Sequence, residues 1–286
     1  MVPIKHLALL SFALLLPIPS RGGGEGFDSN DAHPASLFEQ SAVQTLNRNF
    51  TDSEISFLLL DDRNGQVLAS RWEEPDKPIP LGSLTKPFAA LAYGEHHQFV
   101  YPVHTCAGTI TGCWRPGGHG RMDLTSAIAY SCNSYFRMLT VDLTAADASL
   151  IATRYGLDAP GRDTSGAALA GLGPQWRISP LRMARAYVEL AEERRNPVIS
   201  QILKGMADSA RQGTGAEVDR ALYSTRALAK TGTAACTHSP HAPGDGFTVA
   251  LFPADDPKIL LMVRVHGIPG AQAAKIAGQM LQRIGD

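Results

Sequence analysis

Residues 55–71 read ISFLLLDDRNGQVLASR, and this stretch decides the predicted fold. Two largely apolar runs, 55–60 and 66–71, flank a polar segment that ends in Asn64-Gly65. Asn-Gly between such runs is typical of the tight turn of a β-hairpin, because both residues tolerate a positive φ. We therefore predict two antiparallel strands here.

The patterns on either side of the hairpin complete the fold. Apolar residues at helical spacing over 37–50 predict a preceding helix. The stretch after the hairpin is mostly helical in pattern, with Asp123 and Thr144 as expected N-caps and Ser179-Pro180 as an expected helix start. A short helix is expected within 199–211. Three strand-like runs and a closing amphipathic helix follow, at 222–234, 246–252, 258–266 and 271–284.

This order predicts an α+β fold. We expect an antiparallel five-stranded sheet flanked by helices, with an all-helical lobe inserted between strands two and three. Residues 35–286 would form one domain, in which 35–80 and 215–286 make an α/β lobe and 81–214 a mainly helical lobe. A cleft between two such lobes is a common place for a binding site.

The N-terminus has the pattern of an export signal. An apolar run over 7–16 follows a short basic start, and Ile18 and Ser20 could serve as a cleavage site. We predict a signal peptide over 1–20 and a flexible, glycine-rich linker over 21–34. An uncleaved membrane anchor is the alternative. Either way, the folded part is expected in the periplasm or at the extracytoplasmic face.

Charge and cysteine content limit the classes of partner. Lys and Arg number 26 against 27 Asp and Glu, without a long run of one sign, so we expect no nucleic-acid partner. Cys106 and Cys113 lie close together, and export would permit a disulfide between them. A zinc site of these two with His104 and His119 is the alternative. Its spacing lacks the compact Cys-x-x-Cys of most structural zinc sites, so we expect no metal and no other cofactor.

The first motif with candidate chemistry is Ser83-Leu84-Thr85-Lys86. Pro87 follows it, and because proline fits only the first turn of a helix, the Ser83 hydroxyl is expected near a helix N-terminus. Lys86 would project from the same face and, if unprotonated in a dry cleft, could take the proton of the serine. Taken alone, Ser-x-x-Lys is also expected by chance as a plain helix cap.

Two further motifs follow along the chain. Ser131-Cys132-Asn133 lies between two helical patterns, where a hydroxyl and an amide suit proton relay and carbonyl binding, although an ordinary interhelical turn looks the same. Lys230-Thr231-Gly232-Thr233 lies in a strand pattern. It offers a positive charge, two hydroxyls suited to a carboxylate, and a glycine that permits close approach by another backbone. Each motif alone is weak evidence for a catalytic function.

In this order the three motifs resemble the serine, Ser-x-Asn and Lys-Thr-Gly pattern of the transpeptidase domain of penicillin-binding proteins. The residues around His119 to Asp123 and the helix start at Ser179 are also similar to that family, and the resemblance covers about residues 55–267. It implies a serine D,D-transpeptidase or D,D-carboxypeptidase that acts on D-Ala-D-Ala stem peptides of peptidoglycan. β-Lactams would be covalent inhibitors, and cell-wall assembly proteins would be partners.

The resemblance also implies a role for each motif residue. Ser83 would be the nucleophile, Lys86 its general base, and Ser131 the relay that protonates the leaving amine under the charge of Lys230. The backbone amides of Ser83 and Thr233 would form an oxyanion hole. The remaining residues would bind the substrate: Asn133, Thr231, Gly232 and Thr233.

Two departures and two rivals qualify the resemblance. At 286 residues, the chain leaves no room for the large N-terminal module of the long cell-division and elongation enzymes, and the segment from Asn133 to Lys230 looks short. A class D-like serine β-lactamase is one rival, because Tyr155-Gly156 resembles a motif of that class. Asn133 argues against it, since that class usually has an apolar residue there. The other rival is a sensor or scaffold that binds β-lactams or wall peptides without turnover.

Overall fold

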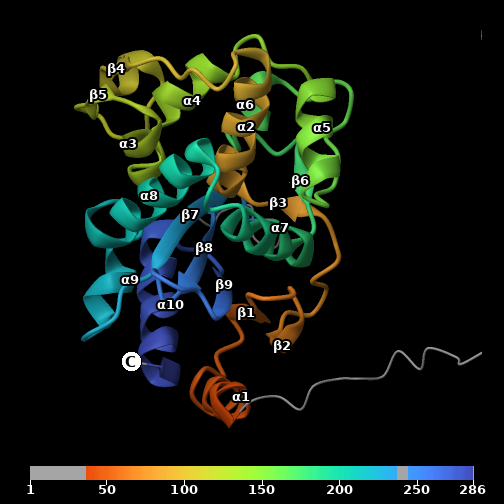
Figure 1. Ribbon diagram of the computed structural model, residues 1–286, viewed down its shortest axis with the longest axis vertical. Coiled ribbons are helices and arrows are strands. Elements are labelled where there is room, and N and C mark those ends of the chain that lie inside the picture. Colours follow the sequence, from red (N-terminus) through yellow and green to blue (C-terminus); the bar gives the residue numbers. More distant parts are fainter. Residues whose placement is uncertain (1–36, 237–243, 286) are drawn as a thin grey trace, which may run out of the picture. The chain divides into compact units, whose positions relative to one another are not determined.

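The computed structural model describes residues 37–236 and 244–285 (Figure 1). The predicted signal peptide and linker lie outside the described residues. In the described part of the chain, no helix is both long and apolar enough to cross a membrane.

The five predicted strands form one antiparallel sheet in the order β2-β1-β9-β8-β7 (Figure 1). The predicted hairpin is present, as β1 (Ile55–Asp61) paired with β2 (Val67–Arg71). The three later strands are β7 (Leu228–Ala234), β8 (Asp245–Phe252) and β9 (Ile259–Val265). Because β9 lies between β1 and β8, the first hairpin and the last strands share one sheet.

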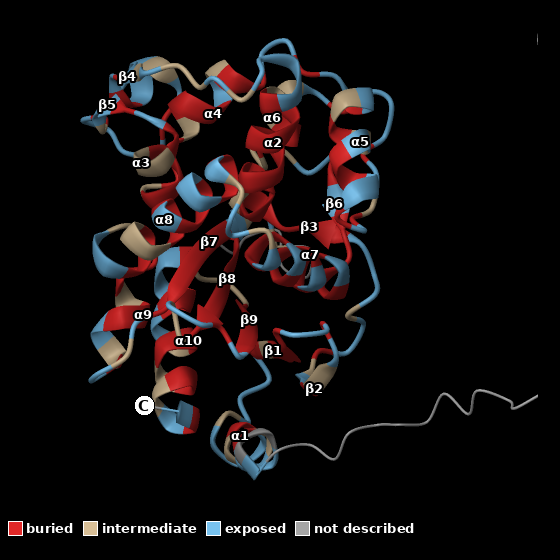
Figure 2. Ribbon diagram, viewed as in Figure 1, coloured by how far each residue is buried: buried red, intermediate tan, exposed pale blue. Residues whose placement is uncertain are grey.

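Helices cover both faces of this sheet. Phe57 and Leu59 of β1 are fully buried in a core with α1 (Leu37–Asn49) and α10 (Gly270–Gly285). Leu58, on the opposite face, is fully buried in a second core with helices of the insert. Alternate residues of a strand point to opposite faces, so a nearly continuous apolar run is expected when both faces are covered. Figure 2 shows the central strands buried throughout.

The insert between β2 and β7 is mostly helical, and its predicted helix starts are confirmed. The side chains of Asp123, Thr144 and Ser179 each accept a hydrogen bond from a backbone N–H in the first turn. The helical elements are η1 (Gly82–Thr85), α2 (Lys86–His96), η2 (Gly108–Thr111), α3 (Leu124–Ala129), α4 (Asn133–Leu139), α5 (Ala145–Arg154), α6 (Gly166–Leu169), α7 (Pro180–Glu192), α8 (Pro197–Gln212) and α9 (Ala216–Ala221).

The structure adds short strands that the sequence did not indicate. β3 (Ile79–Pro80) pairs with β6 (Arg177–Ile178), and β4 (His104–Cys106) pairs with β5 (Gly120–Met122). Each is two or three residues long, too short for a repeating pattern. The strand run expected from 222 begins instead at Leu228, because α9 and a turn precede it.

Candidate active site

The predicted nucleophile lies where the insert meets the sheet. Ser83 lies in η1, which is one turn of 3-10 helix. Helix α2 continues from Lys86 and has Pro87 in its first turn. Gly82 before it has a φ of 56°, and a Cβ built on it would lie 2.1 Å from the Thr233 carbonyl oxygen. Only glycine therefore lets η1 approach β7 so closely. The Ser83 hydroxyl is partly exposed and makes no hydrogen bond to another described residue.

Ser131 adopts a backbone conformation that is rare for its type. It lies between α3 and α4 with a φ of 49°, in the left-handed region, which costs on the order of 1 kcal/mol or more for a residue other than glycine. Its carbonyl oxygen accepts hydrogen bonds from Lys86 Nζ at 2.8 Å and from Trp114 Nε1 at 3.3 Å. These two bonds hold the turn in its strained form, and such strain is concentrated at functional sites.

The three motifs meet at the Ser131 hydroxyl. Lys86 Nζ lies 3.3 Å from Ser131 Oγ and donates to Asn133 Oδ1 at 2.7 Å. Lys230 Nζ, from strand β7, lies 3.0 Å from the same Oγ and donates to the Thr231 carbonyl at 2.8 Å. The structure thus brings four of the predicted site residues into one hydrogen-bonded cluster.

Both lysines in this cluster are fully buried, and no carboxylate among the described residues pairs with either of them. Burial disfavours a charged ammonium group. It lowers the pKa of Lys86 to about 7. The pKa of Lys230 is lowered well below its usual value, first by burial and then by repulsion from Lys86. A lysine with a pKa near 7 is partly unprotonated at neutral pH, which a general base requires.

The remaining residues of the third motif face different surroundings. Thr231 is buried, with Oγ1 2.7 Å from Thr214 Oγ1, whereas Thr233 is exposed and its Oγ1 accepts a hydrogen bond from the Gly270 N–H at 2.9 Å. A Cβ built on Gly232 would lie 2.4 Å from the Leu81 carbonyl oxygen. The glycine therefore serves close packing of β7 on η1, and the proposed contacts of these residues with a substrate carboxylate stay a prediction.

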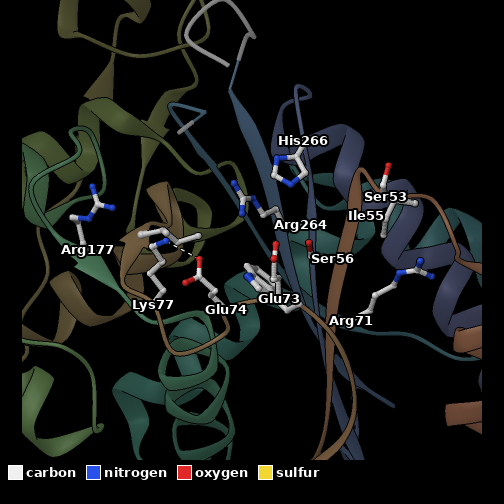
Figure 3. A pocket seen from close by; sticks show the side chains of 12 residues that line it. Ser53, Ile55, Ser56, Arg71, Glu73, Glu74, Lys77, Arg177, Arg264 and His266 are labelled. Atoms are coloured by element: carbon white, nitrogen blue, oxygen red, sulfur yellow. Dashed lines mark hydrogen bonds and ion pairs between the residues drawn. The ribbon is translucent and has the colours of Figure 1, made fainter. Parts of the chain in front are cut away.

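A cavity of about 860 Å³ borders the cluster. Trp114, Tyr130 and Thr214 line it, and these residues contact or adjoin Ser131 and Thr231. Figure 3 shows a second cavity of about 710 Å³, lined mainly by charged side chains that include Glu73 and Arg264. None of the predicted site residues lines either cavity, but the first cavity adjoins the cluster through Trp114 and Thr214, so it is the candidate substrate cleft.

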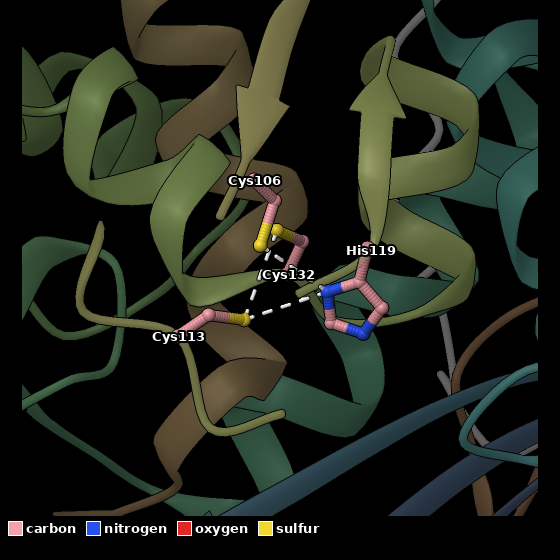
Figure 4. Close-up of side chains that lie close together, drawn as sticks. All are labelled: Cys106, Cys113, His119 and Cys132. Carbon is pink, nitrogen blue, oxygen red and sulfur yellow. Dashed lines mark hydrogen bonds between the residues drawn. The ribbon is translucent and has the colours of Figure 1, made fainter. Parts of the chain in front are cut away.

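Three cysteines and a histidine gather beside the second motif (Figure 4). One ligand atom each from Cys106, Cys113, His119 and Cys132 lies within 4.8 Å of all the others. The disulfide that the sequence allowed is absent, since all three thiols are free. His104 is not in the group, because its Nε2 lies 2.6 Å from Ser134 Oγ. The structure therefore gathers a possible metal-ligand set that differs by one residue from the set considered in the sequence.

The fold and the cluster together define a class of protein: serine enzymes that transfer acyl groups. Residues 55–285 match the penicillin binding protein transpeptidase domain family, and the chain belongs to that family.

Solved structures of such domains have the same fold at low sequence identity. PBP2 from Pseudomonas aeruginosa aligns with a TM-score of 0.68 and 16% identity over 86% of this chain and 72% of the other. The transpeptidase domain of penicillin-binding protein 3 from Burkholderia pseudomallei aligns with a TM-score of 0.64 and 17% identity. The alignment covers 86% of this chain and 91% of the other. PBP2 from Helicobacter pylori, solved in complex with MreC, aligns with a TM-score of 0.69 and 16% identity. The alignment covers 87% of this chain and 63% of the other, so this chain spans less than two thirds of that relative. No curated protein sequence matches the chain.

Sequence reasoning missed two parts of the site. Trp114 supports the strained Ser131 carbonyl, but a lone tryptophan in a turn carries no local signal. Cys132 was considered only as the middle residue of its motif, although three thiols and a histidine within 30 residues were visible. Grouping all three thiols, instead of the adjacent pair, would have found the cluster.

Proposed function

We propose that the protein is a penicillin-binding serine D,D-transpeptidase or D,D-carboxypeptidase that forms an acyl-enzyme on Ser83. The observation that carries the proposal is the buried cluster in which Lys86 and Lys230 both lie within hydrogen-bond distance of Ser131 Oγ. The natural substrate would be the D-Ala-D-Ala end of a peptidoglycan stem peptide.

Acylation would begin with proton transfer from the Ser83 hydroxyl to neutral Lys86. The serine oxygen then bonds to the carbonyl carbon between the two D-alanines, and the backbone amides of Ser83 and Thr233 stabilise the oxyanion. Their proximity is supported by the close approach of Gly82 to the Thr233 backbone. In the present geometry Lys86 Nζ is bonded to Ser131 and Asn133, and catalytic hydrogen bonds often tighten only when substrate is bound.

Collapse of the tetrahedral intermediate requires a proton on the departing D-alanine amine. Ser131 would donate its hydroxyl proton to that nitrogen and regain one from protonated Lys86, which restores the neutral base. The positions of the two lysine Nζ atoms, 3.3 Å and 3.0 Å from Ser131 Oγ, support this relay. Water would then release the shortened peptide, or an amine from a second stem peptide would form a cross-link.

One observation disfavours the β-lactamase rival. Lys86 donates to the Asn133 side chain at 2.7 Å, so a polar amide occupies the position that is usually apolar in class D enzymes. Tyr155, which suggested that class, is buried with its ring against Phe88 and is not part of the hydrogen-bonded cluster described above.

The test is covalent labelling by a fluorescent penicillin. We expect a stable label on the wild-type chain and none on Ser83→Ala. An unlabelled wild-type protein that is folded by circular dichroism would reject the acylation proposal. If labelling occurs, release of D-alanine, cross-linking of peptides and hydrolysis of nitrocefin would distinguish carboxypeptidase, transpeptidase and β-lactamase. A sensor would label without any of the three.

We also propose that the domain works outside the cytoplasm, on cell-wall peptides. The apolar N-terminal run of the sequence supports this location. The relative that was solved with MreC supports a cell-wall assembly protein as partner. Fractionation of cells that express the full chain tests the location, and recovery in the cytosolic fraction alone would contradict it.

A further inference from the structure

The spacing of the four clustered side chains is that of ligands around one metal ion. Cys113 Sγ lies 3.4 Å from His119 Nδ1, Cys106 Sγ lies 3.6 Å from the same nitrogen, and the sulfurs of Cys113 and Cys132 are 3.9 Å apart (Figure 4). A tetrahedral zinc site with ordinary bond lengths has edges of about 3.8 Å between sulfurs and about 3.5 Å between sulfur and nitrogen. All three measured separations agree with these edges.

The chemistry of the set also favours a closed zinc site. Three thiols and an imidazole converge, and Cys3His is one of the common ligand sets of structural zinc. Four protein ligands fill a tetrahedral zinc ion, so no coordination position is left for a substrate. Disulfides do not account for the arrangement, because three thiols cannot all pair and the Cys113 to Cys132 separation is far beyond the S–S bond length of about 2.0 Å.

Three of the ligands come from one hairpin, in which β4 and β5 pair over only three residues. Cys106 ends β4, Cys113 follows η2 and His119 precedes β5, so three ligands belong to one tight hairpin. Within it, the Gly108 and Gly118 backbones are so close that a Cβ on Gly118 would lie 2.6 Å from the Gly108 nitrogen. The loop carries exposed residues such as Ile110 and contributes few to the core. A metal would supply the missing cross-link.

The fourth ligand connects this loop to the catalytic cluster. Cys132 is the N-cap residue of α4 and lies between strained Ser131 and Asn133, both of which contact Lys86. Fixing the Cys132 sulfur would restrict the backbone on both sides of it. Trp114, next to ligand Cys113, donates to the Ser131 carbonyl and adds a second connection from the loop to the same turn.

We propose that this chain binds one zinc ion through Cys106, Cys113, His119 and Cys132, and that the ion positions the Ser131 to Asn133 turn for acylation of Ser83. Binding releases three thiol protons to solvent as the sulfurs become thiolates. The ion takes no part in bond making, and the four ligands are positioning residues. The positioning half of the proposal rests on the proposed function, whereas the binding half does not.

Metal content is the first test, and it needs no activity. Full-length protein, purified without added zinc or chelator, is measured by inductively coupled plasma mass spectrometry. We expect about one zinc per chain in the wild type and in Ser83→Ala, and a loss of most of it in the double variant Cys106→Ser/Cys113→Ser. Cys236→Ser is the control for a thiol outside the cluster. Cys236 lies in a separate group with Asp245 and His266, so this variant should keep the zinc of the cluster. Cobalt substitution should give the visible absorption bands of tetrahedral thiolate coordination.

The second test separates positioning from folding. Chelated wild type that retains its circular dichroism spectrum should acylate with penicillin on the order of tenfold more slowly, with the loss in the acylation rate constant and not in the affinity for penicillin. Added zinc should restore the rate.

Each result has a distinct meaning. Metal-free wild type in which all four thiols can be titrated, or wild type with a Cys106 to Cys113 disulfide found by mass spectrometry, would overturn the zinc site. An unchanged acylation rate after complete zinc removal would overturn the positioning role. Zinc-loaded wild type that never labels would reject the proposed function while the zinc site stands.

Discussion

Two buried groups of basic side chains include residues of strands β7 to β9 that lie about two residues apart in the register of the sheet, and the charges of the two groups are compensated differently. Arg264 on β9 is paired with Asp245 on β8, which Arg264 Nε contacts at 3.0 Å and His266 Nδ1 approaches at 3.3 Å. Lys86 and Lys230 have no such carboxylate among the described residues. Paired cations keep their charge and hold strands together, whereas unpaired buried lysines are pushed toward the neutral form that can accept a proton.

The same comparison explains the pKa of Asp245. Its burial would raise the pKa of the carboxyl, but the hydrogen bonds and charge of Arg264 outweigh that effect and hold the pKa below its ordinary value. Burial disfavours the charged form of every ionisable group. A nearby opposite charge offsets this effect in the Arg264–Asp245 pair, whereas Lys86 lacks a carboxylate partner among the described residues and can therefore act as a base.

Removing the catalytic base should have the largest effect. We expect Lys86→Ala to lower the rate of penicillin acylation by about 1000-fold, within the range for loss of a general base. Lys86→Met retains most of the buried side-chain volume. Its acylation rate should fall to the same extent as that of Lys86→Ala, but its melting temperature should be closer to that of the wild type. Either variant labelling at the wild-type rate would rule out the role of Lys86.

Removing the carboxylate from the paired group should affect stability and not chemistry. Asp245→Ala leaves Arg264 buried without its partner, and we expect a loss of about 3 kcal/mol or more in the free energy of unfolding by urea. Asp256→Ala is the control, because its ion pairs with Lys258 and Arg194 are exposed, and its loss of unfolding free energy should be much smaller. Equal losses of unfolding free energy in the two variants would contradict the larger role assigned to the buried ion pair.

A buried acid without a compensating partner should destabilise the fold at neutral pH. Asp62 is almost fully buried with Oδ1 unpartnered among the described residues, and burial followed by repulsion from Glu192 raises its pKa to about 6. Because the unfolded carboxyl ionises at a lower pH, its contribution to stability falls as pH rises from about 4 to about 6. Asp62→Asn should therefore stabilise the protein by roughly 2 kcal/mol at pH 7 and little at pH 4, as measured by urea unfolding. A gain that is independent of pH would contradict this origin.

The last expected effect is a change in acylation rate with pH. Since burial lowers the pKa of Lys86 to about 7, acylation should fall about tenfold per pH unit below that value and level off above it. Stopped-flow labelling between pH 5 and pH 9 measures the profile. A plateau reached only above pH 9 would mean that Lys86 keeps its ordinary pKa and that the lysine pair is less isolated than its burial indicates.

The sequence predicted local features well and distant pairings poorly. The hairpin was predicted because Asn64-Gly65 and its flanking runs are contiguous, and the caps at Asp123 and Thr144 are equally local. The position of β9 between β1 and β8 depends on contacts across the whole chain, which no local pattern records. The convergence of Lys86, Ser131 and Lys230 was expected only from the resemblance to a family.

The cysteine cluster also depends on distant contacts that local sequence patterns do not record. Its four ligands follow irregular spacings, and the choice of Cys132 over His104 depends on how β4, β5 and α4 meet in space. The left-handed backbone of Ser131 was likewise hidden, because the sequence around it resembles an ordinary turn between helices.

The central position of β9 has a consequence for how the protein forms. β1 and β2 are synthesised early, yet β1 gains its second neighbour only when β9 has left the ribosome, and α10 can cover one face of the sheet only after that. Contacts so distant along the chain close slowly. The nascent polypeptide therefore stays unable to complete its sheet until translation is nearly finished.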